Sequence, residues 1–181
     1  YFNLFGKSDQ INNLIENNDL IKQKCKIFDS ELTIKDNESP LQAAKKNDKS
    51  SMWQTLNSVK INESHIALSA GNTGALLILS KMILEMIKGI DKPALAGLWP
   101  SKKGMNIVLD LGANIECSDK NLIDFSYMGS SLYKSLFHDD LPKIALLNVG
   151  SEEIKGHDEI KKAYQFLKET KLIDFEFIGF V

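Results

Sequence analysis

The sequence contains no arginine, and all 22 of its basic residues are lysines. Any phosphate group bound by this chain must therefore be held by ammonium groups, backbone N–H groups and hydroxyls, because no planar guanidinium fork is present. The 24 acidic residues give a net charge of −2. This balance argues against general nucleic-acid binding, which favours a basic surface.

Cysteine and histidine are also scarce. Cys25 and Cys117 lie far apart and form no Cys-x-x-Cys pattern, so we expect two free thiols in a reducing cytoplasm. His65, His138 and His157 have no metal-ligand spacing. We therefore expect no metal site, with these histidines at the surface or in helix caps.

Long apolar runs are missing as well. No run approaches the roughly 20 residues that span a bilayer, and no signal peptide is visible. A hydrophobic content of 43% and a charged content of 25% are typical of a soluble globular protein. The length predicts one domain over residues 1–181, or most of one, and we expect it in the cytoplasm.

The most informative segment is an apolar strand, expected at 66–68, that runs into a turn at 69–74. A long apolar helix, expected at 75–87, follows at once. Gly71 and Gly74 allow a tight turn and close approach of a ligand, and we expect Thr73 to be the N-cap. The amino end of such a helix suits an anion. An ordinary strand-to-helix turn would explain the two glycines equally well.

Two further strands are expected to end in similar polar turns, at 106–114 and 143–156. The residues in these turns are Asp110, Gly112, Asn114, Gly150, Glu152, Glu153 and Lys155. Ligands of open parallel sheets bind beyond the carboxyl ends of the strands. We therefore predict that Leu68, Leu109 and Leu147 lie in central strands and that the three turns converge on one edge.

The remaining patterns predict further strands and helices in alternation. We expect strands at 2–5, 25–28, 94–99 and 173–181, and helices at 9–17, 51–60, 121–137 and around 160–167. This order is typical of an α/β protein, and we predict a Rossmann-like three-layer fold with a mainly parallel sheet, incomplete at both ends. The helix expected at 75–87 is apolar nearly all round, which indicates a core helix or a subunit interface.

Several motifs together resemble the bacterial phosphate acyltransferases of the PlsX family, in the family's order and spacing. They are Ser50–Met52, Ser69–Ala75, Gly89–Leu95, Leu109–Asn114, Met128–Gly129 and Leu146–Gly156. The resemblance implies transfer of a fatty acyl group from acyl carrier protein to inorganic phosphate, giving acyl phosphate for phospholipid synthesis. It also implies a homodimer, no organic cofactor or metal, and peripheral contact with the membrane through segments absent here.

The chain differs from the family pattern mainly in what is absent. It begins at Tyr1 without methionine and stops in an apolar segment. The family's opening strand with its Asp-Ala-Met-Gly-Gly-Asp turn, its later Asp-Gly-Phe-Thr-Gly-Asn turn and its amphipathic helices are not in it. We therefore expect about half of a family chain, and no activity from residues 1–181 alone.

The implied chemistry needs no nucleophile from the protein, because phosphate itself attacks the thioester. Catalysis then consists of positioning the reactants and stabilising the oxyanion. The resemblance implies that Lys155 is catalytic, either as a charged group that neutralises phosphate or as a neutral amine that accepts its proton. Asn72 is the second catalytic candidate. The candidate substrate-binding residues are Ser69, Gly71, Thr73, Gly74, Asp110, Gly112, Asn114 and Gly150.

Several of these residues could instead have purely structural roles. Asn72 and Thr73 could serve only the turn and the cap, and Asp110 could orient Lys155 or Asn114 or merely close its own turn. We expect Glu152 and Glu153 to be structural, since carboxylates repel phosphate. The lysines that could meet an acidic carrier protein, or form a solvated loop, are Lys45, Lys46 and Lys49.

Three other functions remain open from the sequence. A phosphotransacetylase-like enzyme would take its acyl group from acyl-CoA. A non-catalytic fragment would only dimerise or bind carrier protein. A nicotinamide dehydrogenase is the least favoured, because the dinucleotide glycine pattern is absent.

Overall fold

The computed structural model describes residues 1–45, 49–102, 104–137, 141–170 and 174–181. Helices and parallel strand pairs confirm the predicted α/β class. Along the chain, the elements are β1 (Phe2–Gly6), α1 (Ser8–Ile15), α2 (Asp19–Lys24), β2 (Cys25–Asp29), α3 (Pro40–Ala44), α4 (Ser51–Lys60), α5 (Thr73–Leu84), β3 (Gly97–Ser101), β4 (Gly104–Val108), α6 (Asp119–Leu136), β5 (Lys143–Leu146), α7 (Asp158–Glu169) and β6 (Glu176–Phe180).

The elements group into two compact units, Tyr1–Met86 and Ile87–Val181. Each unit has its own cluster of buried apolar side chains. The single domain over residues 1–181 and the three-layer arrangement both stay predictions.

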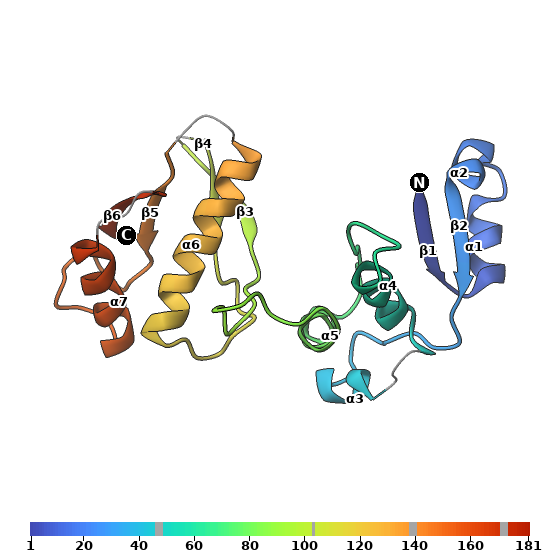
Figure 1. Ribbon diagram of the computed structural model, residues 1–181, viewed down its shortest axis with the longest axis horizontal. Coiled ribbons are helices and arrows are strands. Elements are labelled where there is room, and N and C mark those ends of the chain that lie inside the picture. Colours follow the sequence, from blue (N-terminus) through green and yellow to red (C-terminus); the bar gives the residue numbers. More distant parts are fainter. Residues whose placement is uncertain (46–48, 103, 138–140, 171–173) are drawn as a thin grey trace. The chain divides into compact units, whose positions relative to one another are not determined.

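The first unit begins with a parallel pair of strands, β1 and β2, in register from Phe2 opposite Cys25 to Gly6 opposite Asp29. Helix α1 packs on both strands, and α4 contacts β1 (Figure 1). The rings of Phe5 and Phe28 stack with their centroids 4.9 Å apart. This strand–helix–strand unit has the local pattern expected of a parallel α/β fold.

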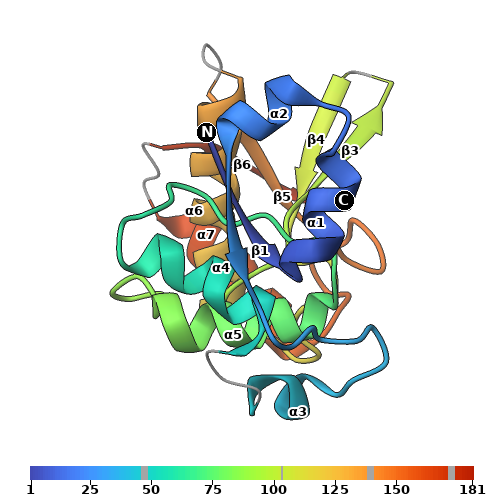
Figure 2. The same ribbon diagram turned by 90° about the vertical axis from the view of Figure 1, so that its right-hand side faces the viewer.

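The rest of the first unit is helical. Helix α5 packs against α3 and α4 (Figure 2). Serine or asparagine caps all three helices, and in each case the side-chain oxygen accepts a backbone N–H of the first turn. The buried apolar cluster at their contact consists of Ala43, Met52, Leu56, Ala75 and Leu79.

The second unit contains two strand pairs and two long helices. Strands β5 and β6 are parallel, and α6 and α7 pack on them (Figure 1). The buried cluster consists of Leu146, Ala163, Tyr164, Leu167, Phe175 and Phe180. A capping box starts α6, in which Ser118 and Asn121 exchange side-chain-to-backbone hydrogen bonds.

Several predicted strand positions are wrong. Residues 66–68 form no strand, and the Leu68 side chain is 89% exposed. Leu109 and Leu147 come directly after β4 and β5 instead of lying within them. Apolar character alone predicted these strands, but a strand also needs a neighbour to receive its backbone hydrogen bonds.

The strand expected at 94–99 begins at Gly97 and pairs antiparallel with β4. The connection from Ser101 to Gly104 is too short for the crossover that a parallel pair requires. Helix α5 ends at Leu84, short of the predicted residue 87, because Glu85 adopts a positive φ of 65°. Of the segment predicted as strand 173–181, Ile173 lies outside the described residues.

Candidate active-site turns

The turn before α5 is organised by the side chain of Asn72. Its Oδ1 accepts the N–H of Ala75 at 3.0 Å and caps the helix. Its Nδ2 donates to the carbonyl oxygens of Lys35, Asp36 and Glu38 at 3.3, 3.1 and 2.9 Å. The N-cap is therefore Asn72, and the prediction of Thr73 was wrong. The contacts of Asn72 favour its structural interpretation.

The other residues of this turn also have packing roles. Ser69 Oγ accepts the N–H of Gly71 at 3.3 Å. A Cβ atom on Gly74 would lie 2.8 Å from Cγ of Pro40, so this glycine lets α5 approach α3. Thr73 is the first residue of α5, whose amino end points its helix dipole at this turn. The turn can therefore attract an anion while its glycines serve the packing.

The loop after β4 is built around the carboxylate of Asp110. Its Oδ1 accepts the N–H groups of Leu95 and Ala113 at 2.8 and 3.2 Å. Its Oδ2 accepts the N–H and Nδ2 of Asn114 at 2.7 and 2.9 Å. Asn114 Nδ2 also donates to the carbonyl oxygen of Pro93 at 2.8 Å. Asp110 thus orients Asn114 and joins two segments of the second unit.

These hydrogen bonds decide the charge state of Asp110. Partial burial raises its pKa, but the N–H donors of Leu95, Asn114 and Ala113 outweigh burial and hold the pKa below its ordinary value. Gly112 lies between them with a φ of +88°, a conformation that favours glycine. The loop is therefore preformed around a carboxylate that stays charged near neutral pH.

The turn after β5 carries Lys155. Its Nζ lies 2.7 Å from Oε1 of Glu152, and about half of each side chain is exposed. Asn148 Nδ2 donates to the carbonyl oxygen of Lys155 at 3.0 Å. The hydrogen bond from Lys155 holds the Glu152 pKa below its usual range. The partner of Lys155 is Glu152, so the suggested orientation of Lys155 by Asp110 is replaced by this pair.

Gly150 belongs to the same turn and touches the same two side chains. A Cβ atom at this position would lie 2.6 Å from Glu152 Oε2 and 3.1 Å from Lys155 Nζ. A larger residue would therefore displace the ion pair. Both atoms are the ends of flexible, half-exposed side chains that can move aside, so this contact does not by itself require glycine.

A pocket of about 330 Å³ lies in the second unit, between β4, β5 and α6. Asp110, Gly112 and Asn114 line it together. Its apolar wall consists of Ile107, Leu109, Leu122, Phe125, Ile144, Ala145, Leu146, Leu147 and Ile160. Cys117 also lines this pocket, and burial raises the pKa of its thiol. The structure thus places three predicted site residues beside an apolar space.

Lys155 and Gly150 lie in their own turn, and among the described residues they are not part of this pocket's lining. Ser69, Gly71, Asn72, Thr73 and Gly74 belong to the first unit. Convergence of the three turns on one edge therefore stays a prediction.

The remaining candidates are placed as follows. Lys49 lies 3.3 Å from Glu31, and Lys45 ends α3 as its C-cap. Lys46 and His138 lie outside the described residues. Cys25 and Cys117 are free thiols. In the described ranges, no group of three or more His, Cys, Asp or Glu side chains is arranged to hold a metal ion.

Comparison with known proteins decides the family. All of residues 1–181 match the family described as "Fatty acid synthesis protein". The chain belongs to the PlsX family. It is 54% identical over 181 residues to a protein named "Phosphate acyltransferase" from Pelagibacter ubique (strain HTCC1062), covering 100% of this chain and 54% of that one.

Proteins with the same name from Brucella are more distant relatives. Those of Brucella canis and Brucella abortus (strain S19) are both 41% identical over 99% of this chain and 52% of their own length. The chain thus spans about half the length of these PlsX relatives. Among the described helices, none is long and apolar enough to cross a membrane.

The structure also shows contacts that the motifs did not reveal. Asn148 lies within the PlsX-like motif 146–156, and its hydrogen bond to the backbone of Lys155 gives it a role that the motif alone did not indicate. Tyr164 lies in the helix expected around 160–167, and its hydroxyl bonds to Glu153 outside that helix. Helical spacing identifies buried positions and carries no information about partners outside the helix.

Proposed function

We propose that the protein transfers a fatty acyl group from acyl carrier protein to inorganic phosphate and releases acyl phosphate for phospholipid synthesis. The observation that carries this proposal is the whole-chain identity of 54% to a relative named phosphate acyltransferase. The geometry supports it with a half-exposed lysine in a hydrogen-bonded turn and a helix amino end suited to an anion.

In this reaction, an oxygen of phosphate attacks the carbonyl carbon of the acyl thioester. The C–O bond forms, the electron pair of the carbonyl moves to its oxygen, and collapse of that oxyanion breaks the C–S bond. The thiolate of the carrier leaves and takes up a proton. No protein nucleophile is needed, so the enzyme contributes position and charge.

Lys155 is the residue we assign to that charge. Its ammonium already lies 2.7 Å from a carboxylate oxygen of Glu152, and an oxygen of phosphate can replace that oxygen as its partner. The ammonium would then offset the charge of phosphate and of the oxyanion. Asn72 is assigned to holding the turn before α5 in place, because its amide is engaged in the helix cap and in three carbonyl contacts.

The other predicted residues receive binding roles in this proposal. The backbone at Ser69, Gly71, Thr73 and Gly74 would contact phosphate at the amino end of α5. Asp110 keeps Asn114 in place beside the pocket. The protein would act in the cytoplasm as a homodimer, with acyl carrier protein as its second partner and with a peripheral contact to the membrane through segments outside this chain.

The test replaces Lys155 in the full-length protein. Lys155→Ala should reduce acyl phosphate formation about a hundred- to thousandfold, the usual effect of losing a contact made in the transition state. Lys155→Arg should restore it only in part, since a planar fork does not replace a compact ammonium. Lys162→Ala, which removes an exposed lysine of α7, is the matched control.

Running the same assay with acyl-CoA in place of the acyl carrier protein thioester separates the two donors. Faster turnover with acyl-CoA would show that acyl-CoA, and not the acyl carrier protein thioester, is the preferred acyl donor. Near-normal activity of Lys155→Ala would instead return Lys155 to the role of a surface lysine.

A further inference from the structure

The turn at 149–155 has little apolar packing to hold it. Ile154 is 84% exposed and Val149 is 81% exposed. A turn without buried apolar side chains depends on polar contacts for its conformation. The position of the Lys155 ammonium therefore depends on the hydrogen bonds that attach this turn to the second unit.

One attachment runs through Glu153, two residues before Lys155. The hydroxyl of Tyr164 donates to Glu153 Oε1 at 2.5 Å, and Lys168 Nζ donates to the same oxygen at 2.7 Å. The hydrogen bond from Lys168, joined by that from Tyr164, holds the Glu153 pKa below its usual range. Two donors from α7 thus fix one carboxylate oxygen of the turn.

Tyr164 is itself firmly held. Its side chain is only 8% exposed, and its ring stacks on Phe180 with centroids 4.5 Å apart. Phe177 meets the same ring edge-on at 5.5 Å. The hydroxyl that anchors Glu153 therefore projects from the buried cluster between α7 and β6, where close packing holds the ring.

The second attachment is Asn148, which directly precedes the turn. Its Nδ2 donates to the carbonyl oxygen of Lys155 at 3.0 Å, while its Oδ1 accepts the N–H of Val149 at 2.9 Å. Its own backbone N–H donates to the carbonyl oxygen of Val181, just beyond β6, at 3.0 Å. Gly156 leaves room for this side chain, because a Cβ atom there would clash with Asn148 Oδ1.

We propose that Glu153, Tyr164 and Asn148 are positioning residues that together hold the Lys155 turn in its reactive conformation. This inference rests on the proposed catalytic role of Lys155. Glu153 ties one side of the turn to the α7–β6 cluster, and Asn148 ties the backbone of Lys155 to the end of β5. Neither contact requires these residues to touch a substrate.

The test is a double-mutant cycle in the full-length protein. The single variants are Tyr164→Phe, Glu153→Ala and Asn148→Ala, and each is also combined with Lys155→Ala. Tyr133→Phe is the matched control, because Tyr133 lies in α6 and its ring packs on Phe137, the C-cap of that helix. For each variant, kcat and the KM values for inorganic phosphate and for the acyl donor are measured, together with the thermal unfolding midpoint.

Each single variant should lower kcat/KM for phosphate about tenfold or more, since small displacements of a catalytic group cost that much or more in rate. KM for the acyl donor should stay unchanged. In the Lys155→Ala background, the same substitutions should have no further effect. Glu153→Gln should keep more activity than Glu153→Ala, because its amide oxygen can still accept the hydroxyl of Tyr164.

Three results would overturn the proposal. Losses that multiply with that of Lys155→Ala would show a general structural role, and unchanged kinetics of Glu153→Ala would show that the attachment does not matter. Glu153 is half exposed, so its variant remains informative even if Tyr164→Phe unfolds. Full activity of Lys155→Ala would reject the catalytic role of Lys155 and this inference with it. Loss of activity in Lys155→Ala together with normal activity of Glu153→Ala would reject this inference alone.

Discussion

Replacing Asp110 with asparagine tests whether the candidate loop after β4 is held by its carboxylate. The two carboxylate oxygens accept four hydrogen bonds, from the N–H groups of Leu95, Ala113 and Asn114 and from Asn114 Nδ2, at 2.7–3.2 Å. An asparagine keeps one accepting oxygen and turns its NH₂ group toward the remaining donors. At least one of the two pairs of hydrogen bonds is therefore lost.

The size of the effect follows from these contacts. A hydrogen bond to a charged group is worth roughly 1.5–3 kcal/mol, and partial exposure of Asp110 reduces that value. We expect Asp110→Asn to lower the free energy of unfolding by about 2 kcal/mol near neutral pH. Asp174→Asn, which removes only an exposed partner of Lys134, should cost about 0–1 kcal/mol.

The pH dependence gives the prediction its sign. The Asp110 pKa in the folded protein lies below its ordinary value of 3.8. The stabilisation is therefore complete above that value and disappears as pH falls through the folded pKa. The difference between the native protein and Asp110→Asn should shrink below about pH 4, whereas it should be constant from pH 6 to 8.

Urea unfolding of the full-length protein at several pH values measures the free energies, and amide hydrogen exchange localises the change. The exchange of the Leu95, Ala113 and Asn114 amides should accelerate in Asp110→Asn. Equal unfolding free energies at pH 7, or a difference that persists unchanged into acid, would refute this account of the loop.

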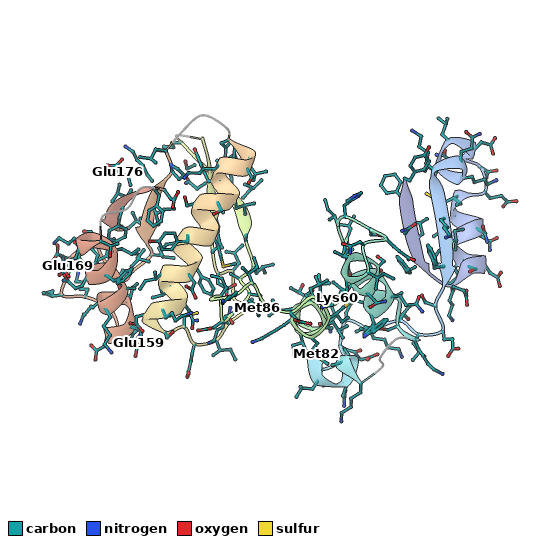
Figure 3. The ribbon with its side chains drawn as sticks, viewed as in Figure 1. Lys60, Met82, Met86, Glu159, Glu169 and Glu176 are labelled. Carbon is teal, nitrogen blue, oxygen red and sulfur yellow. The ribbon has the colours of Figure 1, made fainter. Side chains whose placement is uncertain are left out.

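Two further predictions concern the first unit. Asn72→Ala should lower the free energy of unfolding by about 1 kcal/mol more than Asn72→Ser, because serine can still cap α5. Neither alanine nor serine replaces the amide that donates to the carbonyl oxygens of Lys35, Asp36 and Glu38, so the comparison isolates the cap. Equal urea midpoints of the two variants would show that the cap contributes nothing. The full-length protein should have the mass of a homodimer by light scattering. Met82, labelled on α5 in Figure 3, is 61% exposed, and Met82→Asp should weaken the dimer if the apolar surface of α5 is the interface. A wild-type monomer at micromolar concentration would reject the homodimer.

The helices could largely be predicted from the sequence because their signals are local. Apolar spacing predicted α4 at 51–60, and the structure has it at Ser51–Lys60 with Ser50 as its cap. The polar face of α7 is equally local, and Figure 3 shows Glu159 and Glu169 on that helix, both exposed. Such periodicity depends on residues three and four apart and needs no knowledge of distant partners.

The strands and the site contacts depended on partners that are remote in sequence. Leu68 is as apolar as a strand residue should be, yet no strand forms around it. Both Asn72 and Thr73 suit an N-cap by residue type. In the structure Asn72 is the N-cap, and its amide also donates to the carbonyl oxygens of Lys35, Asp36 and Glu38. These outcomes require the positions of backbone groups more than thirty residues away.

By itself, the sequence determined the α/β class and the family motifs, and with them the candidate residues, because residue types and their order along the chain carry that information. Only the tertiary structure decided what each candidate touches. It paired Lys155 with Glu152, surrounded Asp110 with N–H donors and joined Glu153 to the buried Tyr164. The physical reason is that a charged side chain takes whichever partner the folded backbone brings within about 3 Å of it. Glu152 lies in the same turn as Lys155, but Leu95 and Tyr164 come from other segments, and local sequence does not specify such partners.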